Sequence, residues 1–311
     1  MVRLKSPTGP IENPGGRIAP PGRSPYMSAM TLTPFRKMNG LGNDFVVLDA
    51  RQQKIPLSPA AVQRIADRRS GIGCDTVVVL EPSTRAELMM RFYNSDGSES
   101  SACGNASRCI AWLINDENGN TQPLLETKAG VLKTTVHKDG SVTVDMGKPK
   151  FRWDEIPLSE PFHDTKQIEL QLGPIDKPIL HSPSVVNVGN PHCIFWVEDV
   201  NAHQLDRFGS ILEHHPRFPE RANISLAQIT SPATLKLRVW ERGIGLTQAC
   251  GTGACAATVC AARKGLTDRA VTVTLPGGDL HVDWRADDHM WMTGPAQLDF
   301  IGNLEPAMLQ T

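Results

Sequence analysis

The sequence predicts an α+β fold of two similar domains. Three observations support this prediction: short β-branched runs that alternate with helical stretches, a second half that repeats this order, and the related segments ACGNASRC (102–109) and ACGTGACA (249–256) at matching places in the two halves. Each segment follows a strand and a polar, glycine-containing loop, and each opens a helix. Self-similarity on this scale predicts two similar domains with a site between them.

The first 33 residues differ from the rest of the chain. They contain adjacent glycines, several prolines and little that could build a core. They predict a disordered extension at 1–33, or sequence upstream of a true start at Met27 or Met30. An organelle transit peptide is the alternative because basic residues outnumber the single acidic one, but the prolines and the lack of an amphipathic pattern argue against it. We expect order to begin near Phe35.

The elements of the first half follow from periodicity and composition. Strands are predicted at 45–48, 76–80, 88–93, 131–137 and 142–146. Helices are predicted within 59–69, where apolar residues have helical spacing, and at 104–115, after the polar loop 94–99.

The second half repeats this order of elements. The shared context argues against a chance similarity between the two ACG segments. Strands are predicted at 185–188, 194–197, 226–229, 235–240, 271–275 and 280–284. Helices are predicted at 202–208 and at 251–264, the latter after the loop 243–245.

The bulk composition excludes several classes of function. The chain has 311 residues, 40% hydrophobic and 21% charged, with a formal net charge of -1. It is long enough for two medium domains, and its charge gives no reason to expect a nucleic-acid partner or an anionic membrane surface. A run of about 18 apolar residues would be needed to span a bilayer, and the sequence contains none.

The cysteines indicate a reducing compartment. There are seven, an odd number, and no signal peptide precedes them. A secreted disulfide framework is therefore not expected, and we interpret the thiols as reduced and the protein as cytoplasmic. No pair has the CxxC spacing of a zinc site, and no P-loop or dinucleotide fingerprint is present, so no metal, nucleotide or other cofactor is expected.

Two of these cysteines, Cys103 and Cys250, stand directly before predicted helices. The first turn of a helix leaves N–H groups unpaired and carries partial positive charge, and both effects favour a thiolate. Gly104 and Gly251 follow the cysteines and let the backbone approach a ligand closely. The same N–H groups can hold an anion such as a substrate carboxylate.

A matched pair of such cysteines predicts inversion of a carbon centre. One group must remove a proton from one face of the carbon, and the other must deliver a proton to the opposite face. The base is then a thiolate and the acid a thiol, and reversibility requires that the two exchange roles. A redox pair is the alternative, but it lacks a CxxC motif and a thioredoxin-like context. The other cysteines are interpreted as core residues: Cys74, Cys109, Cys193, Cys255 and Cys260.

The chain resembles diaminopimelate epimerases from about Phe35 to Leu304. The motifs that carry the resemblance occur in the family's order: KMNGLGNDFVVLDA (37–50), FYNSDGSESSACGNASRC (92–109), VGNPHC (188–193), ERANI (220–224), WERGIGLTQACGTGACAA (240–257) and LPGG (275–278). So many motifs in order are far more specific than any one of them.

The resemblance implies a fold and an activity. Each domain would be a curved, mainly antiparallel sheet around a central helix, with the active site in the cleft between the domains. The domains would be 34–149 and 150–295, with 296–311 returning to the first. The implied activity is the interconversion of LL- and meso-diaminopimelate for lysine and peptidoglycan synthesis, without a cofactor. A homodimer is expected from the family alone.

The resemblance also assigns roles by position. Cys103 and Cys250 would be the two acid–base residues. The remaining implied substrate-binding residues are Asn43, Asn94, Gly104, Asn105, Asn190, Asn223, Glu241, Arg242, Gly251 and Thr252. Arginine can hold a carboxylate by a two-point contact, and asparagine and glutamate can receive an ammonium group, as a substrate with two amino-acid ends requires. His192 would tune a catalytic cysteine, and a purely structural histidine is the alternative.

Some positions leave alternatives open. Asparagine often caps turns, so a turn-capping role is the alternative to substrate binding for Asn94 and Asn190. Thr76 stands where many family members carry a substrate-contacting glutamine, and Leu246 replaces a common glutamate. These departures bear on the choice of substrate rather than on the proton chemistry. A proline or other amino-acid racemase, and a non-catalytic binding or thiol-sensing protein, are therefore the rival functions. Oxidation to a Cys103–Cys250 disulfide is a further hypothesis.

Overall fold

The computed structural model describes residues 32–101 and 103–310, so nearly all of the predicted extension at 1–33 lies outside the described residues. The elements of the first half are β1 (Thr33–Gly40), β2 (Asn43–Asp49), α1 (Pro59–Ala66), β3 (Thr76–Glu81), β4 (Leu88–Asn94), β5 (Glu99–Ser100), α2 (Gly104–Asn118), β6 (Leu124–Thr127), β7 (Gly130–Val136) and β8 (Val142–Asp145).

The second half contains the corresponding elements. They are β9 (Gln171–Leu172), β10 (Leu180–His181), β11 (Ser184–Asn187), β12 (Pro191–Trp196), α3 (Leu205–Glu213), β13 (Asn223–Ser231), β14 (Thr234–Glu241), β15 (Gly245–Leu246), α4 (Gly251–Arg263), β16 (Ala270–Leu275), β17 (Gly278–Trp284), β18 (Met290–Gly294), β19 (Gln297–Leu304) and the 3-10 turn η1 (Pro306–Met308).

The strand ladders repeat in the two halves. The pairs β1/β2, β2/β3, β3/β4, β4/β6, β6/β7 and β7/β8 run antiparallel, parallel, antiparallel, parallel, antiparallel and antiparallel. The pairs β11/β12, β12/β13, β13/β14, β14/β16, β16/β17 and β17/β18 follow the same sequence of directions. The predicted α+β fold of two similar, mainly antiparallel domains is therefore confirmed.

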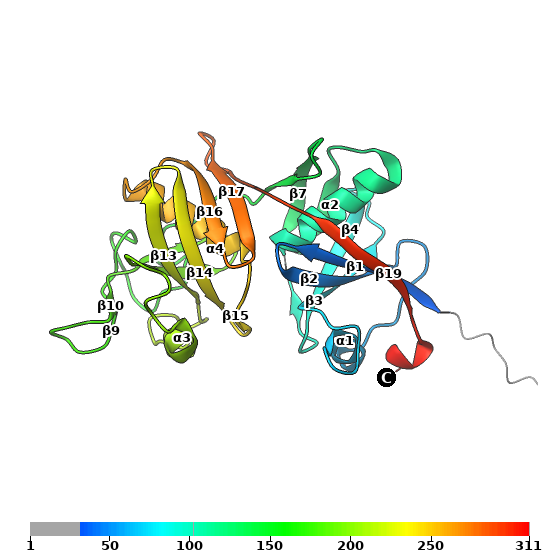
Figure 1. Ribbon diagram of the computed structural model, residues 1–311, viewed down its shortest axis with the longest axis horizontal. Helices are drawn as coiled ribbons and strands as arrows, with labels where there is room; N and C mark the ends of the chain where they lie inside the picture. The colour runs from blue at the N-terminus through cyan, green and yellow to red at the C-terminus, as the bar shows by residue number, and fades with distance from the viewer. Residues whose placement is uncertain (1–31, 102, 311) are drawn as a thin grey trace, which may run out of the picture. The chain divides into compact units, whose positions relative to one another are not determined.

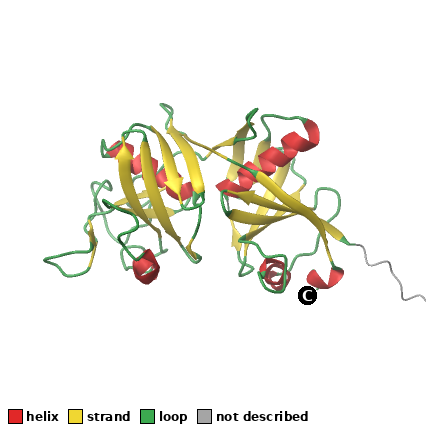
Figure 2. Ribbon diagram, in the orientation of Figure 1, coloured by secondary structure: helices red, strands yellow, loops and turns green. Residues whose placement is uncertain are grey.

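One long helix lies against the strands in each half (Figures 1 and 2). Helix α2 contacts β1, β6, β7 and β8, and α4 contacts β11 to β14 and β16 to β18. The apolar side of α2 includes Cys109, Ile110 and Ile114, all buried. Full burial of each such aliphatic side chain is worth about 1.5–3 kcal/mol. Helix α4 consists mostly of small residues, so the surrounding strands can pack closely on every side of it.

Two strand pairings join the halves along the sheet. Strand β18 runs antiparallel to β8, with Met292 opposite Val144. Strand β19 then runs antiparallel to β1, with Gly302 opposite Phe35. A Cβ atom on Gly302 would lie 2.6 Å from the Phe35 ring, so this close approach requires glycine.

The helix predicted at 202–208 is wrong in its bounds, since α3 begins at Leu205 and ends at Glu213. Residues before Leu205 form turns, with the Ala202 N–H bonded to the Asp199 carbonyl. The helix continues further because Gly209 packs against the Trp240 indole, where a Cβ atom would lie 2.4 Å from the ring.

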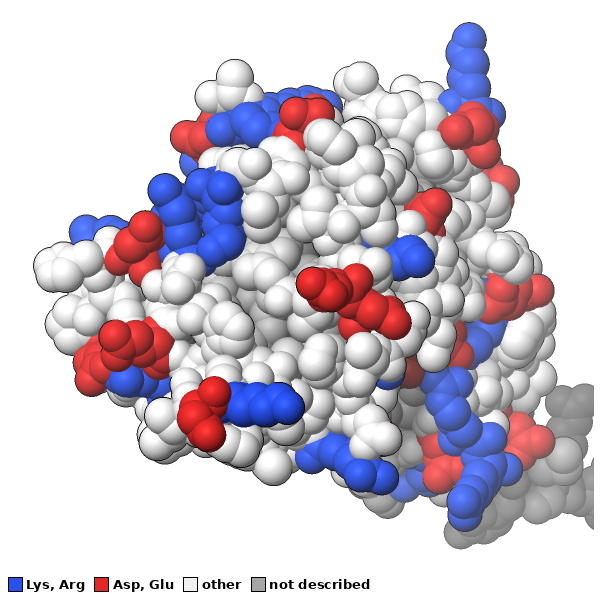
Figure 3. Space-filling view, turned by 60° about the vertical axis from the view of Figure 1, so that its left-hand side comes forward, with Lys and Arg blue, Asp and Glu red and all other residues white. Residues whose placement is uncertain are grey.

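The surface carries charges of both signs, mixed with one another on the face drawn in Figure 3. Within 32–101 and 103–310, no helix is both long enough and apolar enough to cross a bilayer.

Candidate functional site

The two candidate cysteines occupy equivalent positions. Cys103 is the N-cap residue of α2, with φ -148° and ψ 106°, and Cys250 is the N-cap residue of α4, with φ -130° and ψ 105°. The Cys250 sulfur accepts a hydrogen bond from the Gly253 N–H at 3.4 Å and lies 3.5 Å from the Thr252 hydroxyl. All seven cysteines are free thiols, and the five that are not candidates are buried.

The segments that carry the two cysteines are in contact. The Asn105 side-chain N–H donates to the carbonyl oxygen of Ala249, the residue before Cys250, at 3.4 Å. A Cβ atom on Gly251 would lie 2.8 Å from the Met292 sulfur and 3.2 Å from the Asn105 Oδ1. A Cβ atom on Gly104 would lie 2.8 Å from Met146. Glycine at position 251 therefore leaves room for the Asn105 side chain, and glycine at position 104 leaves room for Met146.

Both cysteines are in surroundings that favour the thiol over the thiolate. Burial of the sulfur raises the pKa of Cys103 to about 11, although the N–H groups of Ala106 and Asn105 and the charge of Arg108 act in the opposite direction. Burial, followed by the charge of Glu241, raises the pKa of Cys250 well above 9. Both groups are therefore protonated at neutral pH, and either would be a strong base once ionised.

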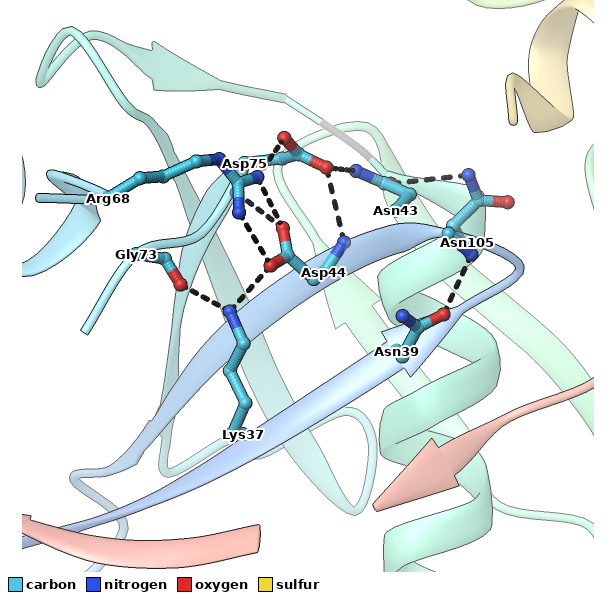
Figure 4. A network of polar contacts seen from close by, with 9 residues as sticks. Lys37, Asn39, Asn43, Asp44, Arg68, Gly73, Asp75 and Asn105 are labelled. Carbon is cyan, nitrogen blue, oxygen red and sulfur yellow. Dashed lines mark hydrogen bonds and ion pairs between the residues drawn. The ribbon is translucent and has the colours of Figure 1, made fainter. Parts of the chain in front are cut away.

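Charged residues of the first half hold Asn43 in place (Figure 4). The Asn43 Nδ2 donates to Asp75 at 2.8 Å, and Asp75 is paired with Arg68 at 2.7 Å. Arg68 also reaches Asp44, which accepts a bond from the buried Lys37 at 2.6 Å. The Lys37 ammonium additionally bonds the Gly73 carbonyl. This network fixes the start of β2, directly after the β1–β2 turn.

The free end of the Asn43 amide faces the first cysteine. Its Oδ1 lies 3.9 Å from the Cys103 sulfur and accepts a bond from Asn105 Nδ2 at 3.2 Å. The structure thus brings three predicted site residues of the first half together and joins them to the segment before Cys250.

A second group of predicted residues meets in the other half. His192 Nε2 lies 2.9 Å from Asn190 Oδ1, and Asn223 Nδ2 donates to the Pro191 carbonyl at 2.9 Å. The Arg242 backbone N–H donates to Asn223 Oδ1 at 2.9 Å. Hydrogen bonds among asparagine, histidine and arginine therefore connect the VGNPHC, ERANI and WERG segments.

His192 is neutral in this environment. Burial first, and then the charge of Arg242, lowers its pKa to about 3. His192 Nε2 lies 2.9 Å from the acceptor Asn190 Oδ1 and 3.5 Å from the donor Asn223 Nδ2, and the shorter contact favours the tautomer with its hydrogen on Nε2 and a lone pair on Nδ1. No residue of the described chain bonds that Nδ1 atom, although it is buried.

Glu241, at the end of β14, interacts electrostatically with both cysteines. Its Oε1 accepts a bond from the Thr247 hydroxyl at 2.6 Å. Burial raises the pKa of its carboxyl group, and its negative charge raises the pKa of Cys103 and of Cys250. The side chain of Arg242 turns toward the Glu220 carbonyl, at 2.9 Å.

The structure does not join Asn94 and Thr76 to the cysteines by any hydrogen bond within the described residues. Asn94 Nδ2 donates to the Ser98 hydroxyl at 3.0 Å, which is the turn-forming role left open for it. Thr76 is buried at the start of β3, opposite Asn94 in the ladder.

Sequence reasoning missed Arg108 and Asp75. Arg108 is fully buried on α2, and its Nη1 donates to Asn105 Oδ1 at 2.9 Å. The spacing of three residues between Asn105 and Arg108 could have shown that they share a helix face. Asp75 carries no such signal, because its contact with Asn43 depends on the parallel pairing of β2 and β3.

A surface hollow of about 400 Å³ is lined by residues including Lys236, Arg238, Leu246 and Gln248, and by none of the candidate site residues. Nowhere in 32–101 or 103–310 do three His, Cys, Asp or Glu side chains gather as they would around a metal ion.

Known proteins share the sequence over most of its length. The model of the diaminopimelate epimerase family matches residues 35–152 and 184–298. The diaminopimelate epimerase of Brucella anthropi is 51% identical over 279 residues, which cover 89% of this chain and 93% of the relative. That of Methylobacterium sp. (strain 4-46) is 54% identical over 292 residues, 91% of this chain and 98% of the relative.

Solved structures share the fold at low sequence identity. A hydroxyproline epimerase from Agrobacterium vitis has a TM-score of 0.64 and 16% identity, covering 88% of this chain and 92% of that structure. A phenazine biosynthesis protein of the PhzF family from Bacillus anthracis has a TM-score of 0.62 and 17% identity, covering 88% of this chain and 99% of that structure. The structural likeness supports the fold, and the extent of the sequence match shows that the chain belongs to the diaminopimelate epimerase family.

Proposed function

We propose that this protein interconverts LL- and meso-diaminopimelate, in the synthesis of lysine and of peptidoglycan precursors. The observation that carries the proposal is the pair of cysteines, Cys103 and Cys250, each at the N-cap of the central helix of its domain. Family membership and relatives named diaminopimelate epimerase supply the substrate.

The reaction moves one proton at each face of the α-carbon. A thiolate on one cysteine takes the α-proton, and the thiol of the other gives its proton to the opposite face, so the enzyme ends with the two protonation states exchanged. A raised thiol pKa means a stronger thiolate base, which the weakly acidic α-proton requires. Closure of the domains on the substrate would keep water away from that base. This chemistry needs no cofactor.

The remaining residues would bind the two amino-acid ends of the substrate. The N–H groups at the starts of α2 and α4, at residues 104–105 and 251–252, would hold the carboxylate beside the reacting carbon and stabilise the charge that develops there. Asn43, Asn190, Asn223, Arg242 and the unpaired nitrogen of His192 offer donors and acceptors for the rest of the substrate, and Asn94 and Thr76 would line the same site.

The test is conversion of LL-diaminopimelate by the purified, reduced protein without added cofactor, followed by chiral chromatography. Appearance of the meso isomer supports the proposal. Proline and hydroxyproline serve as the comparison substrates, because proteins of the same fold act on such rings. Inversion of proline without inversion of diaminopimelate would contradict the substrate assignment.

We further propose that the enzyme works as a cytoplasmic homodimer, through strand β19. Within the described residues β19 pairs only with β1, and Phe300 and Ile301 on it are 50% and 66% exposed. An exposed apolar edge strand favours pairing with another chain. Light scattering should show a dimer that Ile301→Lys converts to monomer. Ile211→Lys, at an isoleucine on α3 that is 62% exposed, is the matched control. A monomer in the unsubstituted protein would refute the idea.

A further inference from the structure

A chain of three hydrogen bonds runs through the first half of the site. Arg108 Nη1 donates to Asn105 Oδ1 at 2.9 Å, Asn105 Nδ2 donates to Asn43 Oδ1 at 3.2 Å, and Asn43 Nδ2 donates to Asp75 Oδ2 at 2.8 Å. The asparagine part of this chain, with Asp75 and Arg68, is drawn in Figure 4. An amide can face either way, so the direction of such a chain depends on its ends.

The two ends determine that direction. A guanidinium group only donates hydrogen bonds, so Asn105 must turn its oxygen toward Arg108. A carboxylate paired with an arginine only accepts, so Asn43 must turn its nitrogen toward Asp75. Both requirements give the same direction to the middle bond, in which Asn105 Nδ2 donates to Asn43 Oδ1. Reversing Asn43 or Asn105 would place two donors or two acceptors against each other.

We propose that Arg108 and Asp75 are positioning residues that together fix the direction of this hydrogen-bond chain, so that Asn43 presents its oxygen, and not its nitrogen, to the Cys103 sulfur. The distance from Asn43 Oδ1 to the Cys103 sulfur is 3.9 Å, within reach of a bond from the thiol. An acceptor at this place stabilises the thiol of Cys103 relative to its thiolate. The Cys250 sulfur accepts an N–H bond from Gly253 and lies beside the Thr252 hydroxyl, and within the described residues no asparagine oxygen is hydrogen-bonded to it.

The burial of Arg108 supports a role for its charge. The side chain is fully buried, its other partners are the Pro295 carbonyl and the Met292 sulfur, and its Nη2 has no partner among residues 32–101 and 103–310. A buried charge without a carboxylate is costly, and an apolar side chain of similar length would fill the space without that cost. The apolar side chain would not provide a group that donates hydrogen bonds and cannot accept them, whereas the guanidinium of Arg108 does.

Other groups also act on Cys103. Glu241 on β14 disfavours its ionisation, and Arg108 together with the N–H groups of Ala106 and Asn105 favours it. Substitutions that remove charge therefore shift its titration directly. A double-mutant cycle separates this from the orientation of Asn43, because charge effects at well-separated sites add, whereas the orientation is lost only when neither end enforces it.

The experiment is an NMR titration of protein carrying [¹³Cβ]cysteine, with the Cys103 signal assigned by Cys103→Ser. The variants are Asp75→Asn, Arg108→Gln and the double variant, since the new amides can donate or accept. We expect the Cys103 pKa in the double variant to be lower than the value that the two single shifts together predict, by at least about half a pKa unit. The reason is that Asn43 can then turn a donor toward the sulfur. Strictly additive shifts would overturn the proposal.

Two further variants keep the result interpretable. Arg108→Lys also places a pure donor at this position, so Arg108→Lys combined with Asp75→Asn should be additive, and a non-additive shift there counts against the proposal. If Arg108→Gln does not fold, Arg108→Met takes its place, since it fills the space without donating. The control is a second double-mutant cycle in which Asp176→Asn, in an exposed loop, takes the place of Asp75→Asn.

The inference rests on the proposed function only in giving Cys103 a catalytic role. The titration needs no turnover, so the absence of epimerase activity and the absence of coupling are separate outcomes.

Discussion

The side-chain amide of Asn105 donates a hydrogen bond to the carbonyl oxygen of Ala249 at 3.4 Å, which ties the first turn of α2 to the residue directly before Cys250. Two residues 144 positions apart thus connect the segments that carry the two cysteines. Geometry at one cysteine therefore depends on residues in the other half of the chain.

Glu241→Gln should lower the pKa of Cys250 and also slow epimerisation. Burial raises that pKa first and the Glu241 charge second, so removing the charge shifts it toward the ordinary value near 9 without reaching it. A weaker thiolate base, together with the loss of a carboxylate that would bind the substrate's ammonium group, should reduce kcat by about 100-fold. The [¹³Cβ]cysteine titration and steady-state kinetics measure the two effects. Glu169→Gln, at an exposed position, is the control, and an unchanged Cys250 titration in Glu241→Gln would refute the electrostatic assignment.

Asp44→Asn should destabilise the protein most at neutral pH and progressively less as the pH falls below about 5. Burial alone would raise the pKa of Asp44, but hydrogen bonds from Arg68 and Lys37 outweigh it and hold that pKa well below its usual value. A carboxylate with a depressed folded-state pKa adds stability above its unfolded pKa, near 4, and the contribution is lost as the pH falls toward the folded value.

We expect Asp44→Asn to lower the free energy of unfolding by about 2 kcal/mol at pH 7. The difference between the variant and the unsubstituted protein should decrease as the pH falls below about 5. Urea unfolding at pH 7 and at pH 3 measures it, with Asp176→Asn as the control. A loss of the same size at both pH values would show that the ion pairs do not carry the effect.

Gly277→Ala should disturb the site from the second half of the chain. A Cβ atom at Gly277 would lie 2.3 Å from the Leu41 carbonyl oxygen, and the Gly277 N–H bonds the Gln248 carbonyl at 2.8 Å. The clash should cost about 1–3 kcal/mol of stability. It should also raise KM, because the displaced β1–β2 turn leads directly into Asn43 at the start of β2. Thermal unfolding and kinetics test this, and Asp279→Ala, at an exposed position of the adjacent strand β17, should leave both nearly unchanged. Normal KM in a folded Gly277→Ala protein would contradict the expectation.

The sequence predicts the elements well where periodicity or composition is strong. The strands around the repeated segments and the helices α2 and α4 lie where they are predicted, because each combines an apolar pattern with glycine-containing boundaries. The short strands β6 and β18 escape prediction, since each has few residues and depends on pairing with distant strands. Helix α3 is misplaced because tertiary packing of Gly209 against Trp240, and not a local signal, sets its extent.

The candidate site also contains residues that the sequence predicts and residues that it does not. The cysteines are predictable because their chemistry follows from their place before a helix. The roles of Arg108 and Asp75 are not, because they arise when three separate segments of the first half bring single polar groups to Asn43 and Asn105. The spacing of Arg108 from Asn105 indicates only a shared helix face and does not reveal the link to Asn43, and Asp75 belongs to no local pattern.

The central claim is that Cys103 and Cys250 exchange the α-proton of diaminopimelate from opposite faces. The most direct measurement is NMR of LL-diaminopimelate in heavy water with the reduced protein and no added cofactor. We predict deuterium at the α-carbon together with the meso isomer, both lost in Cys103→Ala and in Cys250→Ala, with the double variant little worse than either. Meso product formed at an undiminished rate by either single variant would contradict the two-cysteine account.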